Sequence, residues 1–238
     1  MQVDVIASIN ELHTQELLGK TVMVIDVLRA TSSIVTAFAH GCEAIIPVET
    51  VSQARQWNEK QEYLLGGERF CKKISGFDFG NSPLEFTQAD LTGKKLVMTT
   101  TNGTRALQKT HKGSRVLTAS FLNGKAAVKY GMDSHRDWVL VCAGTRDQFS
   151  LEDGLCAGYL LDMLAAVQPD AQMNDMGQAM LSAYRHTESN LVHTLLNCEN
   201  GRKMIKNGMK EDVHFCAQMN AYAIVPLLQE HMLIPVHA

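Results

Sequence analysis

The sequence lacks the features that mark several protein classes. No apolar run approaches the length of a membrane-spanning helix, and the start, Met1-Gln2-Val3-Asp4, lacks the basic and apolar regions of a signal peptide. Aromatic residues make up only 6% of the chain, and no basic stripe is interleaved with them. That distribution and the net charge of −3 disfavour a nucleic-acid surface. We therefore expect a cytoplasmic protein that binds neither membranes nor nucleic acid.

Disulfide and zinc patterns are absent as well. The six cysteines form no C-x-x-C pair and lie mostly in apolar patterns, which indicates reduced core thiols. The nine histidines show neither H-x-x-x-H nor H-E-x-x-H spacing, so a zinc site is not expected. No linker, low-complexity tract or repeat divides the 238 residues. The chain is 45% hydrophobic and 20% charged, which is typical of a folded domain with a substantial core.

Short β-type runs alternate with helical patterns over roughly the first 165 residues. Parallel strands need crossover helices on both faces of a sheet. The alternation therefore predicts an α/β fold, a three-layer α/β/α sandwich whose sheet is largely parallel or mixed. The expected strands are Val3–Ile6, Val22–Asp26, Ala44–Val48, Tyr63–Leu65, Leu96–Thr99, Arg115–Thr118 and Trp138–Cys142. The expected helices are Ile9–Leu18, Ser32–Ala39, Val51–Lys60, Thr104–Lys109, Leu122–Tyr130 and Leu151–Ala166.

The pattern changes after Pro169. It is mainly helical until Ala221–Val225 and Met232–Val236, which predict two late strands. These strands could add an antiparallel edge to the sheet or belong to a small subdomain. We predict a single domain over residues 1–238, with residues 170–238 as a mainly helical C-terminal section.

Polar side chains follow several of the predicted strands. The most informative stretch is Val22–Ser33, where an apolar run ends in Asp26 and Arg29 follows three positions later. Ligands of open parallel sheets bind beyond the carboxyl ends of the strands, so we expect these groups to converge on one rim. They are Asp26, Arg29, Thr31, Ser32, Glu68, Arg69, Thr101, Asn102, Gly103, Thr104, Gly144, Arg146, Glu152 and Asp153.

Residues 66–83 show neither the periodicity of a helix nor that of a strand. Residues 66–83 contain four glycines and a proline, and they predict a long irregular loop of functional importance. Its end, Asn81-Ser82-Pro83, predicts a helix start with Asn or Ser as the cap. The free N–H groups of a helix start favour an anion, so Asn81 and Ser82 are candidate substrate-binding residues.

The acids of these segments suit a hard divalent cation. Mg²⁺ binds through a few carboxylates together with water and substrate phosphate. Asp26 is the first choice of ligand, with Glu68 and either Glu152 or Asp153, and Asp78 is a further candidate. The cations that would balance the substrate's charge are Arg29, Arg69, Lys72, Lys73, Arg105 and Arg146. Such a layout is typical of phosphoryl transfer.

Structural explanations remain open for each motif. Asp26 is also suited to capping a helix, Thr100–Thr104 to an ordinary turn, and Ser150–Asp153 to a capping box that uses one of its acids. The alternative function is a protein that binds a phosphorylated metabolite without turnover, although such a binder gains nothing from several carboxylates in its pocket. A haloacid-dehalogenase-type phosphatase would need a second aspartate where this chain has Leu28.

Four motifs of the chain resemble those of a known family. They are VIDVLRATSSI, GERFCKKISGFDFGNSPLEF, TTTNGTRAL and CAGTRDQFSLEDGLCAG, spread over about residues 3–165. In this order and spacing they are similar to the 2-phosphosulfolactate phosphatase family, Mg²⁺-dependent acid phosphatases of coenzyme M biosynthesis. The resemblance departs at Phe70-Cys71, where the family commonly has Gly-Gly, so we expect the backbone to take a different path there.

The resemblance implies a cofactor, a substrate and a set of roles. The cofactor is Mg²⁺, and the leading substrate is (R)-2-phospho-3-sulfolactate, with another 2-phospho acid as the alternative. We expect Asp26, Arg29, Glu68 and Arg69 to be catalytic, with Asp26 either attacking phosphorus or holding a metal that activates water. The expected substrate-binding residues are Thr31, Ser32, Asn81, Ser82, Thr101, Asn102, Gly103, Thr104, Gly144 and Arg146. The small anionic substrate is the only partner predicted, and a homodimer is compatible with the sequence.

Overall fold

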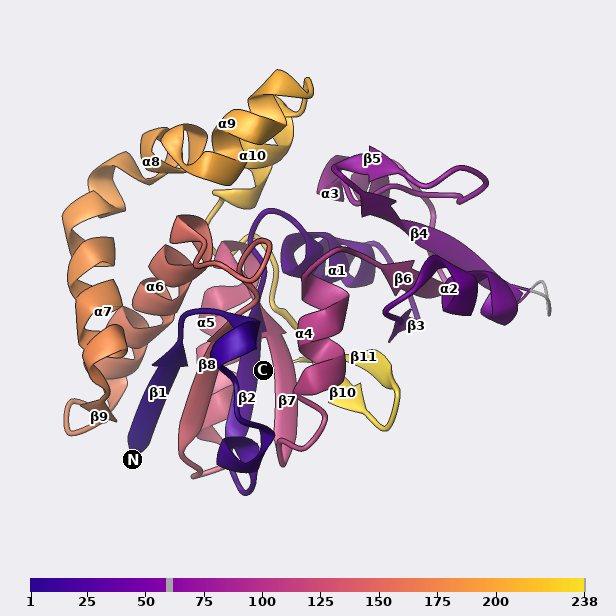
Figure 1. Ribbon diagram of the computed structural model, residues 1–238. Coiled ribbons are helices and arrows are strands. Elements are labelled where there is room, and N and C mark those ends of the chain that lie inside the picture. The colour runs from indigo at the N-terminus through magenta and orange to yellow at the C-terminus, as the bar shows by residue number, and fades with distance from the viewer. Residues whose placement is uncertain (59–61, 238) are drawn as a thin grey trace.

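The computed structural model describes residues 1–58 and 62–237. Within them, the strands form one eleven-stranded sheet with helices on both faces (Figure 1), which confirms the predicted α/β sandwich. The strands are β1 (Gln2–Ile6), β2 (Thr21–Ile25), β3 (Ala44–Pro47), β4 (Tyr63–Arg69), β5 (Lys72–Lys73), β6 (Lys95–Thr99), β7 (Arg115–Ala119), β8 (Trp138–Cys142), β9 (Gln172–Met173), β10 (Ile224–Gln229) and β11 (Met232–His237). The α-helices are α1 (Ala30–Ala39), α2 (Val51–Asn58), α3 (Pro83–Thr87), α4 (Gly103–Lys109), α5 (Gly124–Met132), α6 (Leu151–Val167), α7 (Asp175–Thr187), α8 (Leu191–Asn197), α9 (Glu199–Lys206) and α10 (Lys210–Cys216).

The sheet consists of two parallel halves joined by an antiparallel hairpin. Its order is β5-β4-β6-β3-β11-β10-β7-β2-β8-β1-β9. Strand β11 is antiparallel to β3, and β10 is antiparallel to both β11 and β7. Three successive antiparallel pairings make the two halves run in opposite senses, so their carboxyl ends approach the centre of the molecule from opposite sides (Figure 1). Two late strands are present, although the first begins at Ile224 and not at Ala221. They form neither an edge of the sheet nor a separate subdomain, because they lie in the middle of the sheet.

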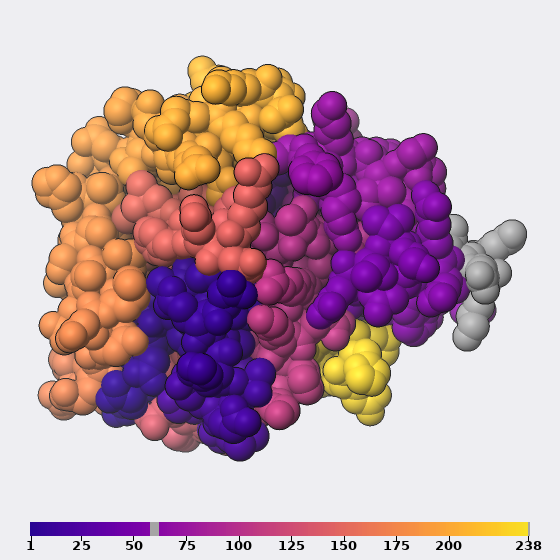
Figure 2. Space-filling model, viewed as in Figure 1, coloured from indigo at the N-terminus to yellow at the C-terminus, as the bar shows by residue number. Residues whose placement is uncertain are grey.

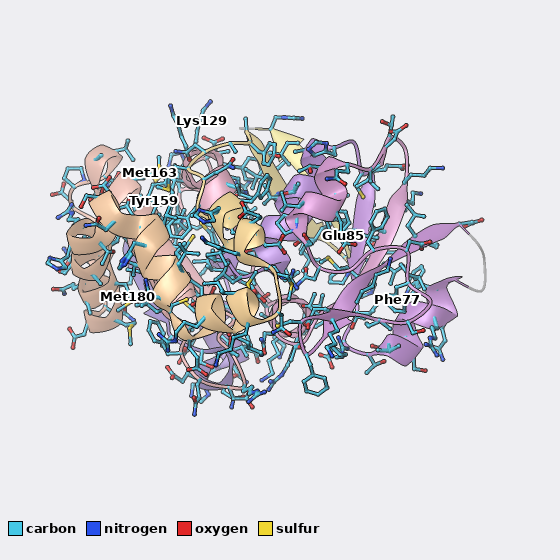
Figure 3. All side chains as sticks on the ribbon, turned by 90° about the horizontal axis from the view of Figure 1, so that it is seen from above. Phe77, Glu85, Lys129, Tyr159, Met163 and Met180 are labelled. Carbon is cyan, nitrogen blue, oxygen red and sulfur yellow. The ribbon has the colours of Figure 1, made fainter. Side chains whose placement is uncertain are left out.

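Both faces of the sheet are buried, which explains the continuous apolar runs of its strands. In β2, Met23 and Ile25 pack in the cluster of α5, α6 and α7 side chains, whereas Val22 and Val24 pack in the cluster of α1 and α4 side chains. Successive side chains of a strand point to opposite faces, so one strand serves both layers. Figure 3 shows Tyr159, Met163 and Met180 in the α6–α7 layer and Phe77 in the other half.

Two predicted segments differ from the structure. The expected helix Ile9–Leu18 is replaced by two 3-10 helices, Ile9–Glu11 and Thr14–Leu17, because the extended residues Leu12 and His13 interrupt it. The expected irregular loop of residues 66–83 is partly regular. Strand β4 continues to Arg69 and pairs with β5 in a hairpin.

The predicted helix Val51–Lys60 is present as α2 up to Asn58, and its last two residues lie outside the described residues. Helix α3 begins at Pro83, as the sequence predicts, but the Ser82 side chain does not cap it.

The C-terminal section crosses the carboxyl ends of the strands. Helix α7 packs along α6, and α8–α10 then pass above the sheet (Figure 1). The surface of α8–α10 meets that of the loop after β8 (Figure 2). Over residues 1–58 and 62–237, no helix combines the length and the apolar character needed to cross a membrane.

Candidate active site

A pocket of about 140 Å³ lies where the carboxyl ends of the two halves meet. Asp26, Arg29 and Thr145, which follow β2 and β8, line it from one half. Glu68 of β4 and Thr101, which follows β6, line it from the other. The predicted convergence of these segments is therefore present, but two facing rims create it instead of one continuous rim.

Asp26 lies at the end of β2 and is 7% exposed. Its Oδ1 accepts the Ala30 N–H at 3.2 Å, so this oxygen caps the first turn of α1. Its Oδ2 lies beside Gly103, where an added Cβ would come within 2.7 Å of it. Burial is the main cause that raises the pKa of Asp26 to about 7. The Ala30 hydrogen bond and Arg29 oppose this shift, and the nearby Glu152 and Glu68 carboxylates add to it. The Asp26 side chain thus both caps α1 and lines the pocket.

Two more buried acids occupy the first turn of α6. Asp153 accepts the Val27 N–H at 2.8 Å and the Gly144 N–H at 3.1 Å, so it ties the segments after β2 and β8 together. Glu152 accepts a hydrogen bond from Asn200 Nδ2 at 2.6 Å and lines an adjoining pocket of about 530 Å³. Burial raises the pKa of both carboxyls, and in Asp153 the charges of Glu152 and Asp26 add to the effect. The acids form an electrostatically coupled group.

Glu68 is held by the segment that was expected to bind phosphate. Its Oε1 accepts hydrogen bonds from the Thr101 N–H at 3.0 Å and the Thr101 hydroxyl at 2.7 Å, and its Oε2 accepts the Cys71 N–H at 2.7 Å. Thr104 is fully buried and its hydroxyl bonds the Thr100 backbone. Asn102 lines the pocket and its side chain does not cap α4. Of the predicted cradle, Asn102 lines the pocket, whereas the Thr101 donors bind Glu68.

The tip of the β4–β5 hairpin borders the same pocket. Phe70 and Cys71 have φ values of 56° and 63°, in the left-handed region that glycine adopts without strain. Two such residues are typical of a tight hairpin turn. In this chain the larger side chains of Phe70 and Cys71 adopt this conformation. The Phe70 side chain is 75% exposed at the pocket mouth.

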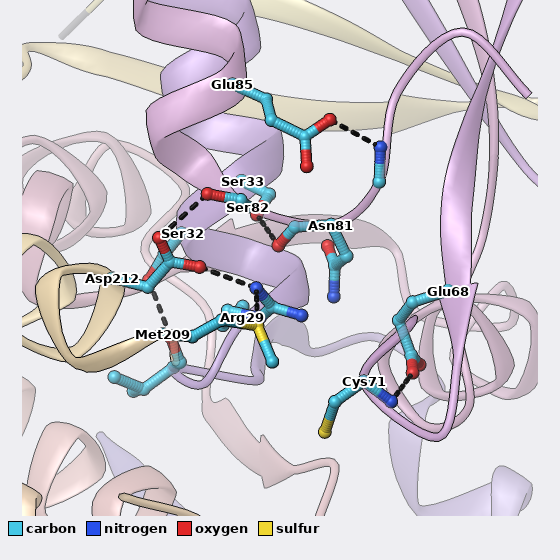
Figure 4. A network of polar contacts seen from close by, with 12 residues as sticks. Arg29, Ser32, Ser33, Glu68, Cys71, Asn81, Ser82, Glu85, Met209 and Asp212 are labelled. Carbon is cyan, nitrogen blue, oxygen red and sulfur yellow. Dashed lines mark hydrogen bonds and ion pairs between the residues drawn. The ribbon is translucent and has the colours of Figure 1, made fainter. Parts of the chain in front are cut away.

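Arg29 is the buried cation of the site. It is 5% exposed, and its Nη1 donates to Asp212 Oδ2 at 2.5 Å and to Met209 Sδ at 3.0 Å (Figure 4). Arg146 and Lys203 line the same pocket. Asn81 also lines it, and its buried Oδ1 has no hydrogen-bond partner within the described residues. The pocket thus combines acids, cations and an amide that a small anionic ligand can contact.

Several predicted site residues use their polar atoms elsewhere. Asp78 is exposed outside the pocket and accepts the Leu65 N–H at 2.7 Å, so it does not join the carboxylate group and the prediction that it does is wrong. The Arg69 guanidinium donates to the Glu68 and Glu49 carbonyls and to the Thr99 hydroxyl. The Lys73 ammonium donates to the Asp78 carbonyl.

Other predicted residues shape the site from behind. The hydroxyls of Thr31 and Ser32 donate to the Asp26 and Val27 carbonyls at 2.8 Å each, and both residues are fully buried. Ser82 donates to Asp212, and Arg105 pairs with Asp147 outside the pocket. The φ of +69° at Gly144 and its close approach to the Gln148 carbonyl require glycine there. These groups hold the backbone around the pocket.

The sequence interpretation missed the contribution of the C-terminal section. Asn200, Lys203 and Met204 of α9 line the pocket, and Asp212 of α10 bonds Arg29. Asn200 also donates to Thr145 Oγ1 at 2.7 Å. These residues lie in ordinary helical patterns far along the chain from the motifs, and no local signal in the sequence distinguishes them.

A metal would find hard oxygen donors here. Within the described part of the chain, no three His, Cys, Asp or Glu residues form a preassembled metal cluster. Asp26 and Glu68 line the pocket and Glu152 lines the adjoining one, and their carboxylate oxygens are of the kind that Mg²⁺ binds together with water and phosphate. Burial raises the pKa of both Asp26 and Glu152, and a bound cation would favour their ionised forms.

The fold and the site define a class: an α/β enzyme with a small pocket for an anionic ligand beside coupled acids. A family model described as 2-phosphosulpholactate phosphatase matches residues 7–231. Relatives named "Probable 2-phosphosulfolactate phosphatase" include one from Symbiobacterium thermophilum, 39% identical over 92% of this chain and 96% of its own length. Another from Clostridium novyi is 36% identical over 95% of this chain and 96% of its own length. A third from Clostridium perfringens is 38% identical over 94% of this chain and 92% of its own length.

The chain therefore belongs to the 2-phosphosulfolactate phosphatase family. Its class is that of a phosphatase, a phosphoric monoester hydrolase. The resemblance drawn from four motifs is confirmed, and the matched range extends to residue 231 in the C-terminal section.

Proposed function

We propose that the protein hydrolyses (R)-2-phospho-3-sulfolactate to 3-sulfolactate and phosphate in a Mg²⁺-dependent reaction. The observation that carries the proposal is one small pocket that combines the coupled carboxyls of Asp26 and Glu68 with the cations Arg29, Arg146 and Lys203. The names of the relatives support this substrate, and the substrate name suggests a role in coenzyme M biosynthesis. A cytoplasmic location and a homodimer stay predictions.

Asp26, Glu68 and Glu152 would hold the metal. When bound, Mg²⁺ supplies neutralisation of phosphoryl charge and lowers the pKa of a coordinated water. Asn200 fixes the Glu152 carboxylate through its 2.6 Å hydrogen bond, and Asp153 keeps the two loops beneath the pocket in place through two N–H donors. The chain's own contribution is thus a rigid set of oxygen donors next to the substrate.

Arg29 and Asp26 act on the phosphate itself in this proposal. The buried guanidinium donates hydrogen bonds to phosphoryl oxygens and offsets the charge that develops on them. Asp26 would act as the ionised carboxylate, which either attacks phosphorus or serves as a metal ligand. Acid quenching during turnover of a radiolabelled phosphate ester separates the two roles, because only attack by Asp26 leaves label on the protein.

The surrounding cations favour a substrate with additional anionic groups. Arg146 and Lys203 line both the small pocket and the adjoining one, where Arg202 is added. A carboxylate or sulfonate on the substrate would form charge-assisted hydrogen bonds that a neutral alcohol phosphate cannot form. We expect 2-phospho-3-sulfolactate, or a close analogue such as phosphoglycolate or 2-phospholactate, to exceed glycerol phosphate and sugar phosphates in kcat/KM.

A panel of these esters, assayed with and without Mg²⁺, tests the proposal. Turnover should require the cation and disappear after treatment with a strong chelator. Full turnover of metal-free protein would contradict the metal assignment. Preference for phosphoglycolate or 2-phospholactate over 2-phospho-3-sulfolactate would assign the enzyme to another 2-phospho acid. Equal efficiency on all esters would show that Arg146 and Lys203 do not select the substrate.

A further inference from the structure

A carboxylate of the C-terminal section is built into the wall of the site. Asp212 lies in the first turn of α10 and is 4% exposed. Its Oδ2 accepts from Arg29 Nη1 at 2.5 Å, and its Oδ1 accepts from the Ser82 hydroxyl at 2.7 Å. Figure 4 shows these contacts, with Asp212 on the side of Arg29 away from Glu68. Segments that are far apart in the chain thus meet at one guanidinium.

The geometry leaves part of Arg29 available to a ligand. Both recorded contacts of the guanidinium, with Asp212 and with Met209 Sδ, use Nη1. Over the described residues, no hydrogen bond engages Nε or Nη2, and Arg29 lines the pocket with Asp26 and Glu68. Asp212 itself does not line the pocket. It therefore holds one end of the guanidinium while the rest remains open to the pocket.

The burial of the Asp212–Arg29 ion pair calls for a functional explanation. Removing two charges from water is unfavourable, and a buried pair often stabilises a fold less than apolar residues of the same volume would. A planar guanidinium that is fixed at one nitrogen is, however, already oriented for an oxyanion, so binding loses less side-chain freedom. The additional Ser82 hydrogen bond fixes the carboxylate in turn.

We infer that Asp212 is a positioning residue, which orients Arg29 for the phosphoryl group of the substrate and couples the C-terminal helices to catalysis. This inference rests on the proposed phosphatase site. It assigns a role to α10, which otherwise packs against α3, α8 and α9.

Calorimetric titration with inorganic phosphate in the presence of Mg²⁺ tests the inference without turnover. The variants are Asp212→Asn, Arg29→Ala and the double variant. Partners that orient a binding group typically contribute 10- to 100-fold in affinity or activity, so Asp212→Asn should weaken phosphate binding by about that factor. Asp162→Asn is the control, because it breaks another arginine pair, with Arg185 at 2.6 Å, outside both pockets. The control should bind phosphate like the parent.

The double variant separates positioning from a merely structural effect. If Asp212 acts through Arg29, adding Asp212→Asn to Arg29→Ala should weaken phosphate binding no further. If the two losses multiply, the inference is overturned. If the parent binds phosphate and Asp212→Asn binds it with the same affinity, the inference is overturned as well. That result would leave the phosphatase proposal standing. A parent without phosphate binding would overturn the pocket assignment and this inference together.

Ser82→Ala provides a milder variant if Asp212→Asn does not fold. It removes the hydrogen bond to Asp212 Oδ1 and leaves the buried ion pair intact. We expect phosphate affinity to fall by about two- to fivefold, less than for Asp212→Asn, because the hydroxyl only steadies the carboxylate that holds Arg29. In steady-state assays the loss should appear in both kcat and KM. Unchanged phosphate affinity in a folded Ser82→Ala would contradict the inference.

Discussion

At the scale of single residues, Asp26 has separate tasks for its two carboxylate oxygens. Oδ1 caps α1 through the Ala30 N–H, and Oδ2 lies in the region between Gly103 and the pocket. Asparagine retains an oxygen for the cap but removes the charge. Substitution at this residue therefore separates the structural task from the chemical one.

We expect Asp26→Asn to lower kcat by about a hundredfold or more, as for loss of a nucleophile or metal ligand. The fold should survive because the cap survives. Steady-state kinetics with 2-phospho-3-sulfolactate and a thermal unfolding curve measure the two effects. Near-normal turnover would mean that Asp26 is only a helix cap.

The same variant should change how stability depends on pH. In the unfolded chain the carboxyl ionises near its ordinary pKa of 3.8, whereas in the folded protein its pKa is about 7. The native state therefore holds a proton that the unfolded state has lost, and stability falls as pH rises from about 4 to about 7. Metal-free Asp26→Asn should lack this loss and be more stable than the parent at pH 8, by up to about 4 kcal/mol.

Urea unfolding of both metal-free proteins at pH 5 and pH 8 measures that difference. Glu152 and Asp153 also have raised pKa values, so the variant should keep part of the pH dependence. Identical pH profiles for parent and variant would contradict the assigned burial of charge at Asp26.

At the scale of elements, the starts of α1 and α4 approach each other closely beside Asp26. A Cβ at Gly103 would lie 2.4 Å from the Ala30 Cβ and 2.7 Å from Asp26 Oδ2. The Ala30 Cβ is fixed by the backbone and cannot move aside, so a Cβ at Gly103 would push the two helix starts apart and displace the Asp26 carboxylate. Glycine at the first position of α4 is therefore required by packing, and this contact fixes the distance between the two helices.

Gly103→Ala should consequently destabilise the protein by about 1–3 kcal/mol, as overpacking of a dense core does, and reduce kcat through displacement of Asp26. Gly177→Ala in α7 is the matched control, because its nearest contact would be 3.2 Å and it lies outside the site. Denaturant unfolding and kinetics of both variants check this. Similar behaviour of the two variants would show that α1 and α4 can separate without cost.

At the scale of the whole molecule, the β10–β11 hairpin connects the two halves of the sheet. Val225 of β10 and Leu233 of β11 are fully buried, each in a core cluster that includes other strands. Each half also carries one of the two tryptophans: Trp57 on α2, and Trp138 on β8. The tryptophans can therefore report on the unfolding of each half separately.

We expect both halves to unfold together, as one domain. In Trp57→Phe and in Trp138→Phe, the urea midpoint from fluorescence should coincide with the midpoint from far-ultraviolet circular dichroism of the same variant. Leu233→Ala should lower both midpoints, at a cost of about 2–5 kcal/mol for a buried leucine. Separate midpoints within either variant would indicate that the halves are independent domains.

The sequence by itself determined most of the elements and the composition of the site. Short continuous apolar runs and helical patterns depend on neighbours along the chain, so β2, β6, β7 and β8 lie where the sequence predicts them. Asp26, Arg29, Glu68 and Asn81 come directly from local motifs, and all four line the pocket. The resemblance read from those motifs agrees with the family match.

Only the tertiary structure decided which elements are neighbours. The hairpin β10–β11 lies inside the sheet because long-range pairing with β3 and β7 places it there, and no local pattern encodes that choice. Asp78 belongs to one of the four motifs, as Asp26 does, yet it accepts a hydrogen bond from a backbone N–H outside the pocket. Asp212 and Asn200 belong to the site because α9 and α10 fold back over the strand ends. Side chains far apart in a chain meet through packing of whole elements, and that packing depends on the complete set of buried surfaces.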